Sequence, residues 1–268
     1  MMVRLKSQRE LDRLRASGEL VGRTLGEVAR YLEPGVTTLE LDREAERFVR
    51  QNDAEPAFKG YTMPGLKPFP GTLCVSVNDV VVHGIPGAYK LREGDVVSID
   101  CGVRLDGYFG DSAYTFALGQ ITVAEQALCQ AAYEALYRGV GAAVSGNRVG
   151  DISHAVATRC ARYGVVRDLA GHGIGRELHE KPQIPNYGRP GRGTLLRTGA
   201  TICIEPMINL GTHAVTTSAD GWTVRTADGT TSAHYEHMVA ISDGDPEILT
   251  TFSYIEDVIE PPYIVTHG

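Results

Sequence analysis

The 268-residue sequence has few of the features that mark secreted, membrane-spanning or nucleic-acid-binding proteins. Its five cysteines are odd in number, widely spaced and without a CxxC pair, which favours reduced thiols over a disulfide framework. No run approaches the roughly 20 apolar residues of a membrane span, and residues 1–6 lack the apolar core of a signal peptide. A net charge of −7 argues against a nucleic-acid-binding surface. We therefore expect a soluble, cytoplasmic protein that binds neither membranes nor nucleic acids.

Several common catalytic motifs are also absent. The sequence contains no HExxH, no GxSxG, no P-loop and no strand-following GxGxxG. Residues 171–175 (GHGIG) superficially suggest a phosphate-binding loop, but a histidine lies inside the segment and no Lys-Ser/Thr follows it. Any enzymatic activity must therefore depend on other residues.

Four segments have the apolar spacing of amphipathic helices that pack one face against a core. Three begin with a capping box, in which a Ser or Thr and a Glu three positions later satisfy backbone N–H groups. Pro34-Gly35 ends the first helix. The first three helices are expected to start at Ser7, Thr37 and Thr122, and the fourth to span about 149–163.

Patterns typical of β-strands fill the chain between the second and third helices and again after the fourth. Asp106-Gly107 predicts a tight hairpin turn between strands 96–103 and 108–118. The remaining strands are predicted at 73–82, 200–209, 221–227 and 235–241.

A short motif occurs twice. Leu91-Arg92-x-Gly94 followed by Ile99-Asp100 recurs as Leu196-Arg197-x-Gly199 followed by Ile204-Glu205, at an offset of 105 residues. Chance similarity is the alternative, but we interpret the repeat as an internal duplication. It predicts a single domain over 1–268 with halves of roughly 7–120 and 121–250. Duplication would make two carboxylates, Asp100 and Glu205, face each other across a pseudo-two-fold axis.

Two carboxylates on the predicted hairpin are candidates for a cation site. Counting back from the turn leaves Asp100 and Asp111 close to opposite each other, where like charges are destabilising unless a cation lies between them. Asp100 ends an apolar run, which indicates partial burial, and a buried carboxylate pair is costly unless neutralised. The alternative is that one or both lie on a solvated face.

A histidine and two glutamates have comparable positions. His172 is flanked by glycines that leave its imidazole accessible, and His179 follows seven residues later. A lone histidine is more often a packed or surface residue than a ligand. Glu205 ends the apolar strand Ile202-Cys203-Ile204, and strand alternation places Glu236 on the opposite face from its two neighbours.

Four carboxylates and one imidazole form an oxygen-rich ligand set. Such a set suits Mn²⁺, Fe²⁺ or Co²⁺ better than a structural zinc, which favours thiolates. Four negative charges balance two divalent ions, whereas one ion would leave excess negative charge buried. We therefore predict two ions about 3.5–4 Å apart, bridged by carboxylates and a water or hydroxide, as in two-metal hydrolases. The predicted ligands are Asp100, Asp111, His172, Glu205 and Glu236.

With these residues, segments along essentially the whole chain resemble the type I methionine aminopeptidases. The most diagnostic segments are Val82-His83-Gly84-Ile85-Pro86 and Asp220-Gly221-Trp222-Thr223. The other matching segments are 76–81, 171–175 with His179, 204–207 and 235–237. The resemblance implies a pita-bread fold of the α/β (α+β) class, with two pseudo-symmetric halves, an antiparallel sheet and outer helices.

The resemblance also implies separate roles for the metal ligands. Asp100 would bind one ion, His172 and Glu205 the other, and Asp111 and Glu236 would bridge the pair. A water bridging the ions would attack the scissile carbonyl.

Three residues would act on the scissile amide in the same scheme. His83 would contact the amide nitrogen and help protonate the leaving amine, and His179 would stabilise the carbonyl oxygen and its tetrahedral intermediate. Glu205 would shuttle a proton from the bridging water.

The implied substrate is the initiator methionine of a nascent polypeptide, removed when the second residue is small by a monomer that contacts the ribosome transiently. Tyr61, Phe69, Cys74 and Trp222 would wall the methionine pocket, because sulfur–aromatic contacts favour methionine. His83 and His179 would also touch the substrate. Without the resemblance, the alternative for Trp222 is a core or surface anchor.

The sequence departs from the family pattern at two places. Val82 stands where many bacterial members have cysteine, and residues 62–71 lengthen the segment between Tyr61 and Cys74. Two alternatives share the predicted fold. An X-Pro peptidase generally carries a large N-terminal domain, and a non-catalytic pita-bread protein loses metal ligands that are all present here.

Overall fold

A computed structural model describes residues 3–259 and 261 of the chain. The ends of the predicted 1–268 domain, at 1–2 and 262–268, lie outside the described residues. Within the described part, no helix combines the length and the hydropathy needed to cross a membrane.

The four predicted helices are confirmed. In each of the first three, the capping-box glutamate accepts the N-cap backbone N–H, at 3.0 Å (Glu10), 2.7 Å (Glu40) and 2.9 Å (Glu125). The fourth helix ends four residues earlier than predicted, and a short fifth helix near the C-terminus was not predicted. The helices are α1 Gln8–Ala29, α2 Thr38–Gln51, α3 Val123–Gly141, α4 Val149–Arg159 and α5 Ser253–Glu256.

The predicted hairpin is the longest β-structure. Strands β4 (Val96–Leu105) and β5 (Tyr108–Ala117) pair along their full length. Asp106 and Gly107 both have left-handed φ angles, 49° and 80°, as a tight hairpin turn requires. Two further strands flank β4 in the same sheet, β1 (Glu55–Pro56) and β2 (Leu73–Val77).

The single strand predicted at 73–82 is wrong. Strand β2 ends at Val77, the chain turns at Asn78 with φ 54°, and β3 (Val80–Val82) enters a different sheet. The φ of Asn78 is positive, a conformation that asparagine tolerates better than most residues, and this local turn outweighs the continuous Val-rich pattern.

A five-stranded sheet and two small sheets complete the fold. The five-stranded sheet has the order β15-β14-β9-β7-β8. Its strands are β15 Glu247–Ile248, β14 His237–Ala240, β9 Thr201–Ile204, β7 Ala170–Gly173 and β8 Glu180–Pro185. The small sheets are β13-β10-β6 (Ser232–His234, Met207–Asn209, Gly164–Val165) and β11-β12-β3 (Val215–Thr217, Val224–Thr226, Val80–Val82).

Two predicted strands are interrupted at matching positions. The strand expected at 200–209 breaks between β9 and β10 at Glu205-Pro206, and the strand expected at 235–241 begins only at His237. Pairing resumes on both sides, from Ile204↔His237 to Met207↔His234. The two gaps therefore lie opposite each other, and each contains one of the predicted glutamate ligands.

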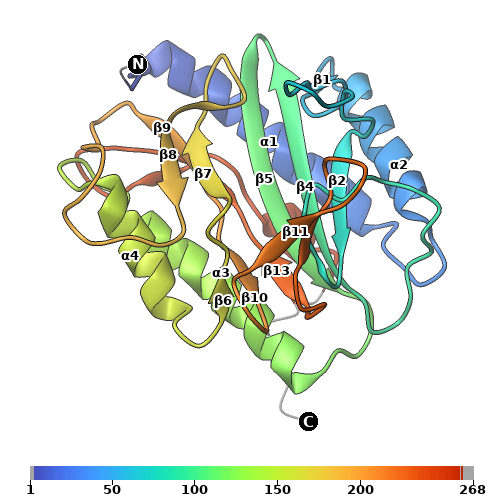
Figure 1. Ribbon diagram of the computed structural model, residues 1–268. Helices are drawn as coiled ribbons and strands as arrows, with labels where there is room; N and C mark the ends of the chain where they lie inside the picture. Colours follow the sequence, from blue (N-terminus) through green and yellow to red (C-terminus); the bar gives the residue numbers. More distant parts are fainter. Residues whose placement is uncertain (1–2, 260, 262–268) are drawn as a thin grey trace.

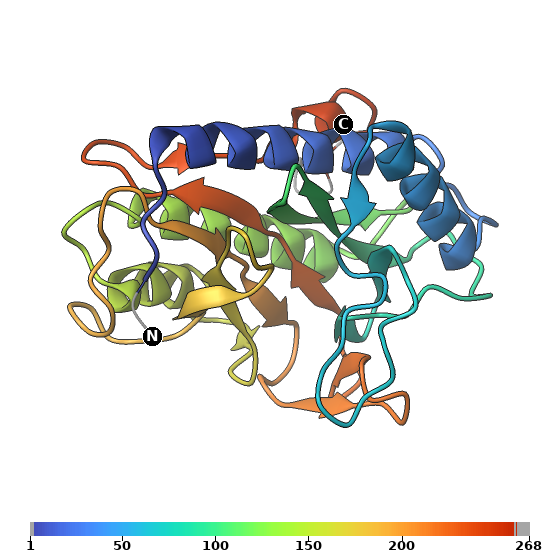
Figure 2. The same cartoon turned by 90° about the horizontal axis from the view of Figure 1, so that it is seen from above.

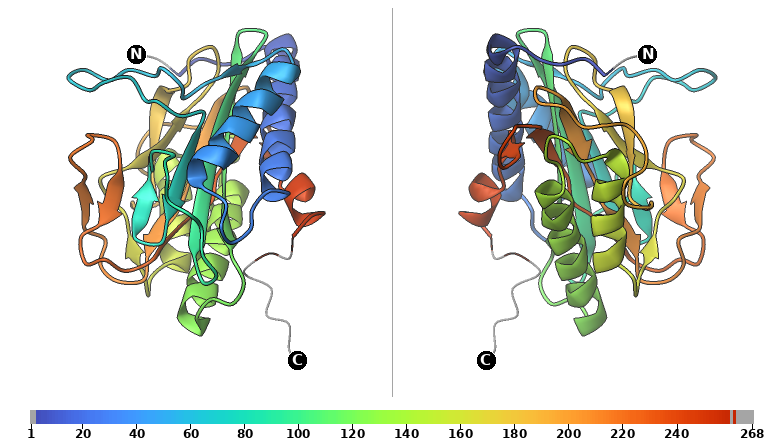
Figure 3. Two further views of the ribbon diagram at one scale, coloured as in Figure 1. Left: turned by 90° about the vertical axis from the view of Figure 1, so that its right-hand side faces the viewer. Right: turned by 90° about the vertical axis from the view of Figure 1, so that its left-hand side faces the viewer.

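The helices and the loops lie on different sides of the strands. Figure 1 shows α3 and α4 beside the central strands, and Figure 2 shows α1 running along one side of them. Figure 3 shows α1, α2 and α5 on one side, while the β11–β12 hairpin and the loop around residues 62–70 protrude on the opposite side. The helices cover the main apolar core, and residues of these loops line the same cavity as the predicted ligands.

Local hydrogen bonds recur in the two predicted halves. Gly94 N donates to Leu118 O at 2.6 Å, and Gly199 N donates to Ile241 O at 3.0 Å. Both glycines have positive φ and belong to the repeated motif. A single β-bridge also joins a helix start to the segment ahead of each glycine: Thr37 with Lys90, and Arg148 with Leu195.

Candidate metal centre

The β4–β5 hairpin presents two carboxylates to one cavity. Asp100 pairs with Ala113 and Asp111 pairs with Gly102, so the two carboxylates are diagonal neighbours, two residues out of direct register. Alternation along each strand still places them on the same face. The two carboxylates therefore lie on the same face of the hairpin, as predicted, but they are not directly opposite each other.

His172 lies on strand β7 and not in a glycine-rich loop. A Cβ at Gly171 would overlap the carbonyl oxygen of Cys203, and a Cβ at Gly173 would overlap that of Lys181. The glycines therefore allow neighbouring strands to approach closely on both sides of His172.

The imidazole of His172 is oriented by its own backbone. Its Nδ1 lies 2.9 Å from the carbonyl oxygen of Gly173, a contact in which the ring nitrogen donates. The other nitrogen, Nε2, then carries a lone pair and lies 3.8 Å from Asp111 Oδ2 and 3.7 Å from Glu205 Oε1. A backbone carbonyl that fixes the tautomer is typical of histidines that ligate metals.

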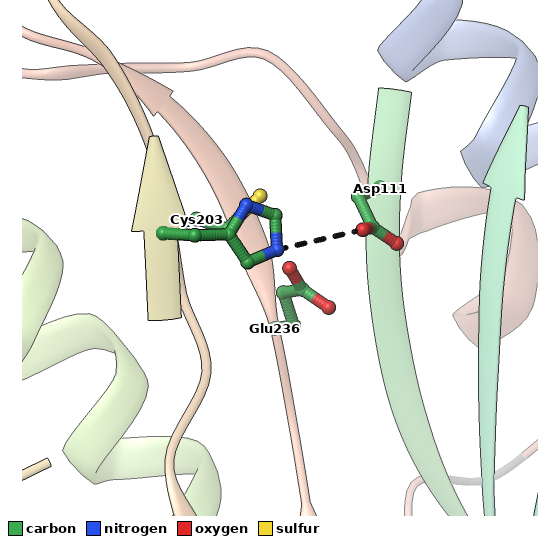
Figure 4. Close-up of side chains that lie close together, drawn as sticks. Asp111, Cys203 and Glu236 are labelled. Atoms are coloured by element: carbon green, nitrogen blue, oxygen red, sulfur yellow. Dashed lines mark ion pairs between the residues drawn. The ribbon is translucent and has the colours of Figure 1, made fainter. Parts of the chain in front are cut away.

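One member of the centre was missed from the sequence. The side chains of Asp111, Cys203 and Glu236 point toward one another in Figure 4, where the dashed line is the approach of His172 to Asp111. Donor atoms of these four residues all lie within 4.8 Å of one another. The sequence could have indicated Cys203, because alternation along a strand places it on the same face as Glu205, two positions later.

The electrostatics of the centre are unfavourable without a cation. Burial raises the pKa of Asp100 to about 7, and burial followed by neighbouring carboxylates raises those of Asp111, Glu205 and Glu236 well above their ordinary values. Burial lowers the pKa of His172 to about 3, so its imidazole is neutral. Raised carboxyl and lowered imidazole pKa values in one cavity are typical of functional sites.

The centre has the free oxygens that a metal requires. Among the described residues, Asp100 Oδ1, Asp111 Oδ1 and Glu236 Oε1 are buried with no hydrogen-bond partner. Such atoms are costly unless something binds them. The donor set is rich in oxygen with one neutral nitrogen, which fits a divalent ion of the Mn²⁺, Fe²⁺ or Co²⁺ type.

All the predicted site residues border one cavity of about 710 Å³. They are Tyr61, Phe69, Cys74, His83, Asp100, Asp111, His172, His179, Glu205, Trp222 and Glu236. The structure therefore brings together every residue singled out from the sequence.

An aromatic wall lies beside the acidic centre. Trp222 is buried and makes edge-on contacts with Phe69 and Tyr61, with ring centroids 5.4 Å and 6.4 Å away. Its indole N–H donates to the carbonyl of Lys67 at 2.9 Å. Phe69 N also donates to Tyr61 O, so the ends of the inserted loop meet and both aromatic residues stay at the cavity.

Two histidines line the cavity. His83 has a left-handed φ of 57°, a strained conformation that is often found at functional sites. Burial lowers its pKa to about 4. The ring of His179 lies 4.4 Å from that of His172, and its Nδ1 lies 2.7 Å from the hydroxyl of Tyr61.

Two apolar residues of the cavity were also missed. Phe58 and Leu178 are buried in the same cluster as Phe69 and Trp222 and line the cavity. Leu178 directly precedes His179, so its place in a site loop was readable. Phe58 gave no signal in the sequence, because a distant contact of its segment with Gly102 on β4 positions it.

A buried acidic centre with one neutral imidazole, open to a cavity, is the site of a metal-dependent enzyme. Residues 12–243 match metallopeptidase family M24. A methionine aminopeptidase from Clostridium acetobutylicum is 48% identical over 252 residues, covering 93% of this chain and 99% of that protein. Methionine aminopeptidase 1 of Bacillus subtilis is 45% identical, covering 93% and 99%. The chain therefore belongs to the methionine aminopeptidases of metallopeptidase family M24.

Solved structures agree with this assignment. A methionine aminopeptidase from Rickettsia prowazekii superimposes with a TM-score of 0.90 at 38% identity, covering 93% of this chain and all of that one. A prolidase from Pyrococcus horikoshii matches with a TM-score of 0.74 at 20% identity and is covered over only 63% of its length. The fold is the pita-bread fold, as predicted. Family membership and the buried centre together indicate dependence on a divalent metal.

Proposed function

We propose that this enzyme removes the initiator methionine from nascent polypeptides when the second residue is small. One observation carries the proposal: a single cavity of about 710 Å³ joins the acidic centre to an aromatic and sulfur-containing pocket. The names of its relatives support methionine as the residue removed.

The centre would hold two divalent ions, of Co²⁺, Mn²⁺ or Fe²⁺. Asp100 would bind one ion, His172 and Glu205 the other, and Asp111 and Glu236 would bridge them. Four carboxylates balance the charge of two ions. A fifth anionic ligand is therefore not needed, and Cys203 would remain a neutral neighbour of Glu236.

The chain's own residues would handle the protons of the reaction. When bound, the ions lower the pKa of a water and polarise the substrate carbonyl. Glu205 would accept a proton from the attacking water. His179 would donate a hydrogen bond to the carbonyl oxygen as negative charge develops on it, and His83 would help protonate the leaving amine.

The methionine side chain would enter the apolar pocket. Trp222 and Phe69 would contact the thioether through their rings, since sulfur–aromatic contacts contribute about 0.3–1.5 kcal/mol. Tyr61 and Cys74 would complete the wall.

We further propose one domain formed by internal duplication, with halves of roughly 7–120 and 121–250. The recurring hydrogen bonds of Gly94 and Gly199 support it. The enzyme would act as a cytoplasmic monomer with transient ribosome contact, without nucleic-acid or membrane binding of its own. Five buried, free cysteines support a reducing compartment.

The test is hydrolysis by purified protein loaded with Mn²⁺, Co²⁺ or Fe²⁺. We expect release of methionine from Met-Gly and Met-Ala peptides and no cleavage of an X-Pro dipeptide. Asp111→Asn should abolish release, whereas Asp79→Asn, which breaks a surface ion pair with Arg225, should not. Protein that binds no metal and cleaves neither substrate would instead be a binding module, and cleavage of X-Pro alone would make it a prolidase-like enzyme.

A further inference from the structure

The segment that precedes α1 is attached to the hairpin that carries His179. Lys6, in this segment, has a side chain only 3% exposed. Its ammonium donates to Glu180 Oε2 at 2.6 Å and to the carbonyl of Arg4 at 3.2 Å. A lysine is seldom buried unless it is paired. By contrast, Lys59, which forms an ion pair with Glu46, has a side chain 41% exposed.

Glu180 joins this lysine to the backbone of the β7–β8 loop. Its second oxygen, Oε1, accepts the backbone N–H groups of Arg176 at 2.9 Å and Glu177 at 3.4 Å. A Cβ at Gly175 would lie 2.5 Å from Glu180 Oε1 and 2.7 Å from Lys6 Cε, so the loop leaves room for this ion pair only with glycine there. One carboxylate therefore bonds a buried cation on one side and the loop backbone on the other.

The backbone of Lys6 is itself bonded to the segments that flank β9 and β14. Lys6 N donates to Gly199 O at 2.7 Å, and Gly199 N donates to Ile241 O just beyond β14. If Glu180 moved, it would therefore break its ion pair with a lysine whose backbone is held by Gly199.

The loop held in this way ends at the catalytic face. His179 is adjacent to Glu180 in the chain, and the preceding Leu178 is buried against the cavity. Other contacts also hold this loop. They include the 2.7 Å contact of His179 Nδ1 with the Tyr61 hydroxyl, the hydrogen bond from Phe109 N to Gly175 O and an exposed ion pair between Arg176 and Glu10.

We propose that the buried Lys6–Glu180 pair positions His179 for its contact with the substrate carbonyl, which makes the N-terminal segment part of the active site. The inference rests on the function proposed above, in which His179 touches the reacting carbonyl. Lys6 acts through Glu180 and the loop backbone and touches no reacting atom. A displacement of about 1 Å in a catalytic group can reduce the rate on the order of 100-fold.

The first test compares Lys6→Met with Lys59→Met, the same change at the exposed ion pair. In the metal-loaded full chain, Lys6→Met should lower kcat for a Met-Ala peptide about 10- to 100-fold, with metal content kept and KM within about twofold. Lys59→Met should change neither constant. A fall in thermal stability with kcat unchanged per folded molecule would overturn the proposal.

A double-mutant cycle tests whether Lys6 affects catalysis through His179. If Lys6 acts through His179, Lys6→Met should lower kcat by less than about twofold in a His179→Ala background. Equal losses in both backgrounds would show that Lys6 acts elsewhere and would refute the proposal.

Hydrogen exchange tests the positioning role of the Lys6–Glu180 pair without a measurement of activity. The amides of Arg176 and Glu177 should lose protection in Lys6→Met but not in Lys59→Met. If Lys6→Met does not fold, Glu180→Gln, which keeps an acceptor oxygen, should show the same loss and the same fall in kcat. Inactive wild-type protein would defeat the proposed function, whereas unchanged exchange in an active enzyme would defeat only the positioning role.

Discussion

The most informative perturbation is removal of divalent ions, because the centre is costly when its oxygens have no partner. Asp100, Asp111 and Glu236 each bury one oxygen that, within the described residues, has no hydrogen bond. An unsatisfied buried polar group costs about 1–3 kcal/mol. The three together therefore destabilise the metal-free protein by about 3–9 kcal/mol, a large part of the roughly 5–15 kcal/mol by which a domain is stable.

Reloading the metal should recover this energy. For a domain of this size each kcal/mol shifts Tm by about 2–4 °C, so saturating Mn²⁺ or Co²⁺ should raise Tm by at least about 6 °C. The matched variant is Asp111→Asn, which removes one buried charge and supplies an N–H to its neighbours. Without metal, this variant should be more stable than wild type by about 1–3 kcal/mol.

Calorimetry or denaturant unfolding at about pH 8, with and without chelator, measures both effects, since ordinary carboxyls are ionised there. The metal-dependent rise in Tm should be largely lost in Asp111→Asn and kept in Asp79→Asn. An Asp111→Asn protein that is less stable than wild type without metal, or that responds to metal as wild type does, would refute the reasoning.

Three further predictions concern single residues. His179→Ala should lower kcat about 100-fold or more with metal content retained, as activity and metal analysis would show, and loss of the ions would contradict its proposed role. Trp222→Ala should reduce the preference for Met over norleucine by about 2- to 12-fold, measured as a ratio of kcat/KM, because the sulfur–aromatic contact is removed. Burial lowers the pKa of His237 to about 3, so the neutral ring stabilises the fold above pH about 6.5, and that stability is lost as pH falls toward 3. Between pH about 6.5 and 5, His237→Gln should therefore lose about 2 kcal/mol less stability than wild type in denaturant unfolding, and parallel curves would contradict this.

The local signals in the sequence predicted the helices and the hairpin well. The capping boxes at Ser7, Thr37 and Thr122 and the turn at Asp106-Gly107 depend on neighbouring residues alone, and each is confirmed. Strand continuity was predicted less well. Glu205 was recognised as the end of an apolar strand, but the break at Glu236 interrupts an alternating pattern, and only pairing between distant strands shows that the two gaps lie opposite each other.

The centre could be assembled from the sequence because its residues lie in recognisable segments. Its geometry could not be predicted in the same way. The diagonal placement of Asp100 and Asp111 depends on hairpin register, and the contact of Lys6 with Glu180 joins residues 174 positions apart. No local pattern in the sequence encodes such a contact.

The most direct test of the proposed two-metal centre is a crystal structure of the metal-loaded protein with anomalous scattering data. The proposed roles predict two anomalous peaks about 3.5–4 Å apart in the cavity, both within bonding distance of Asp111 and Glu236. One peak should also contact Asp100, and the other His172 and Glu205. A single peak at saturating ion concentration, or peaks that do not share Asp111 and Glu236, would contradict the account.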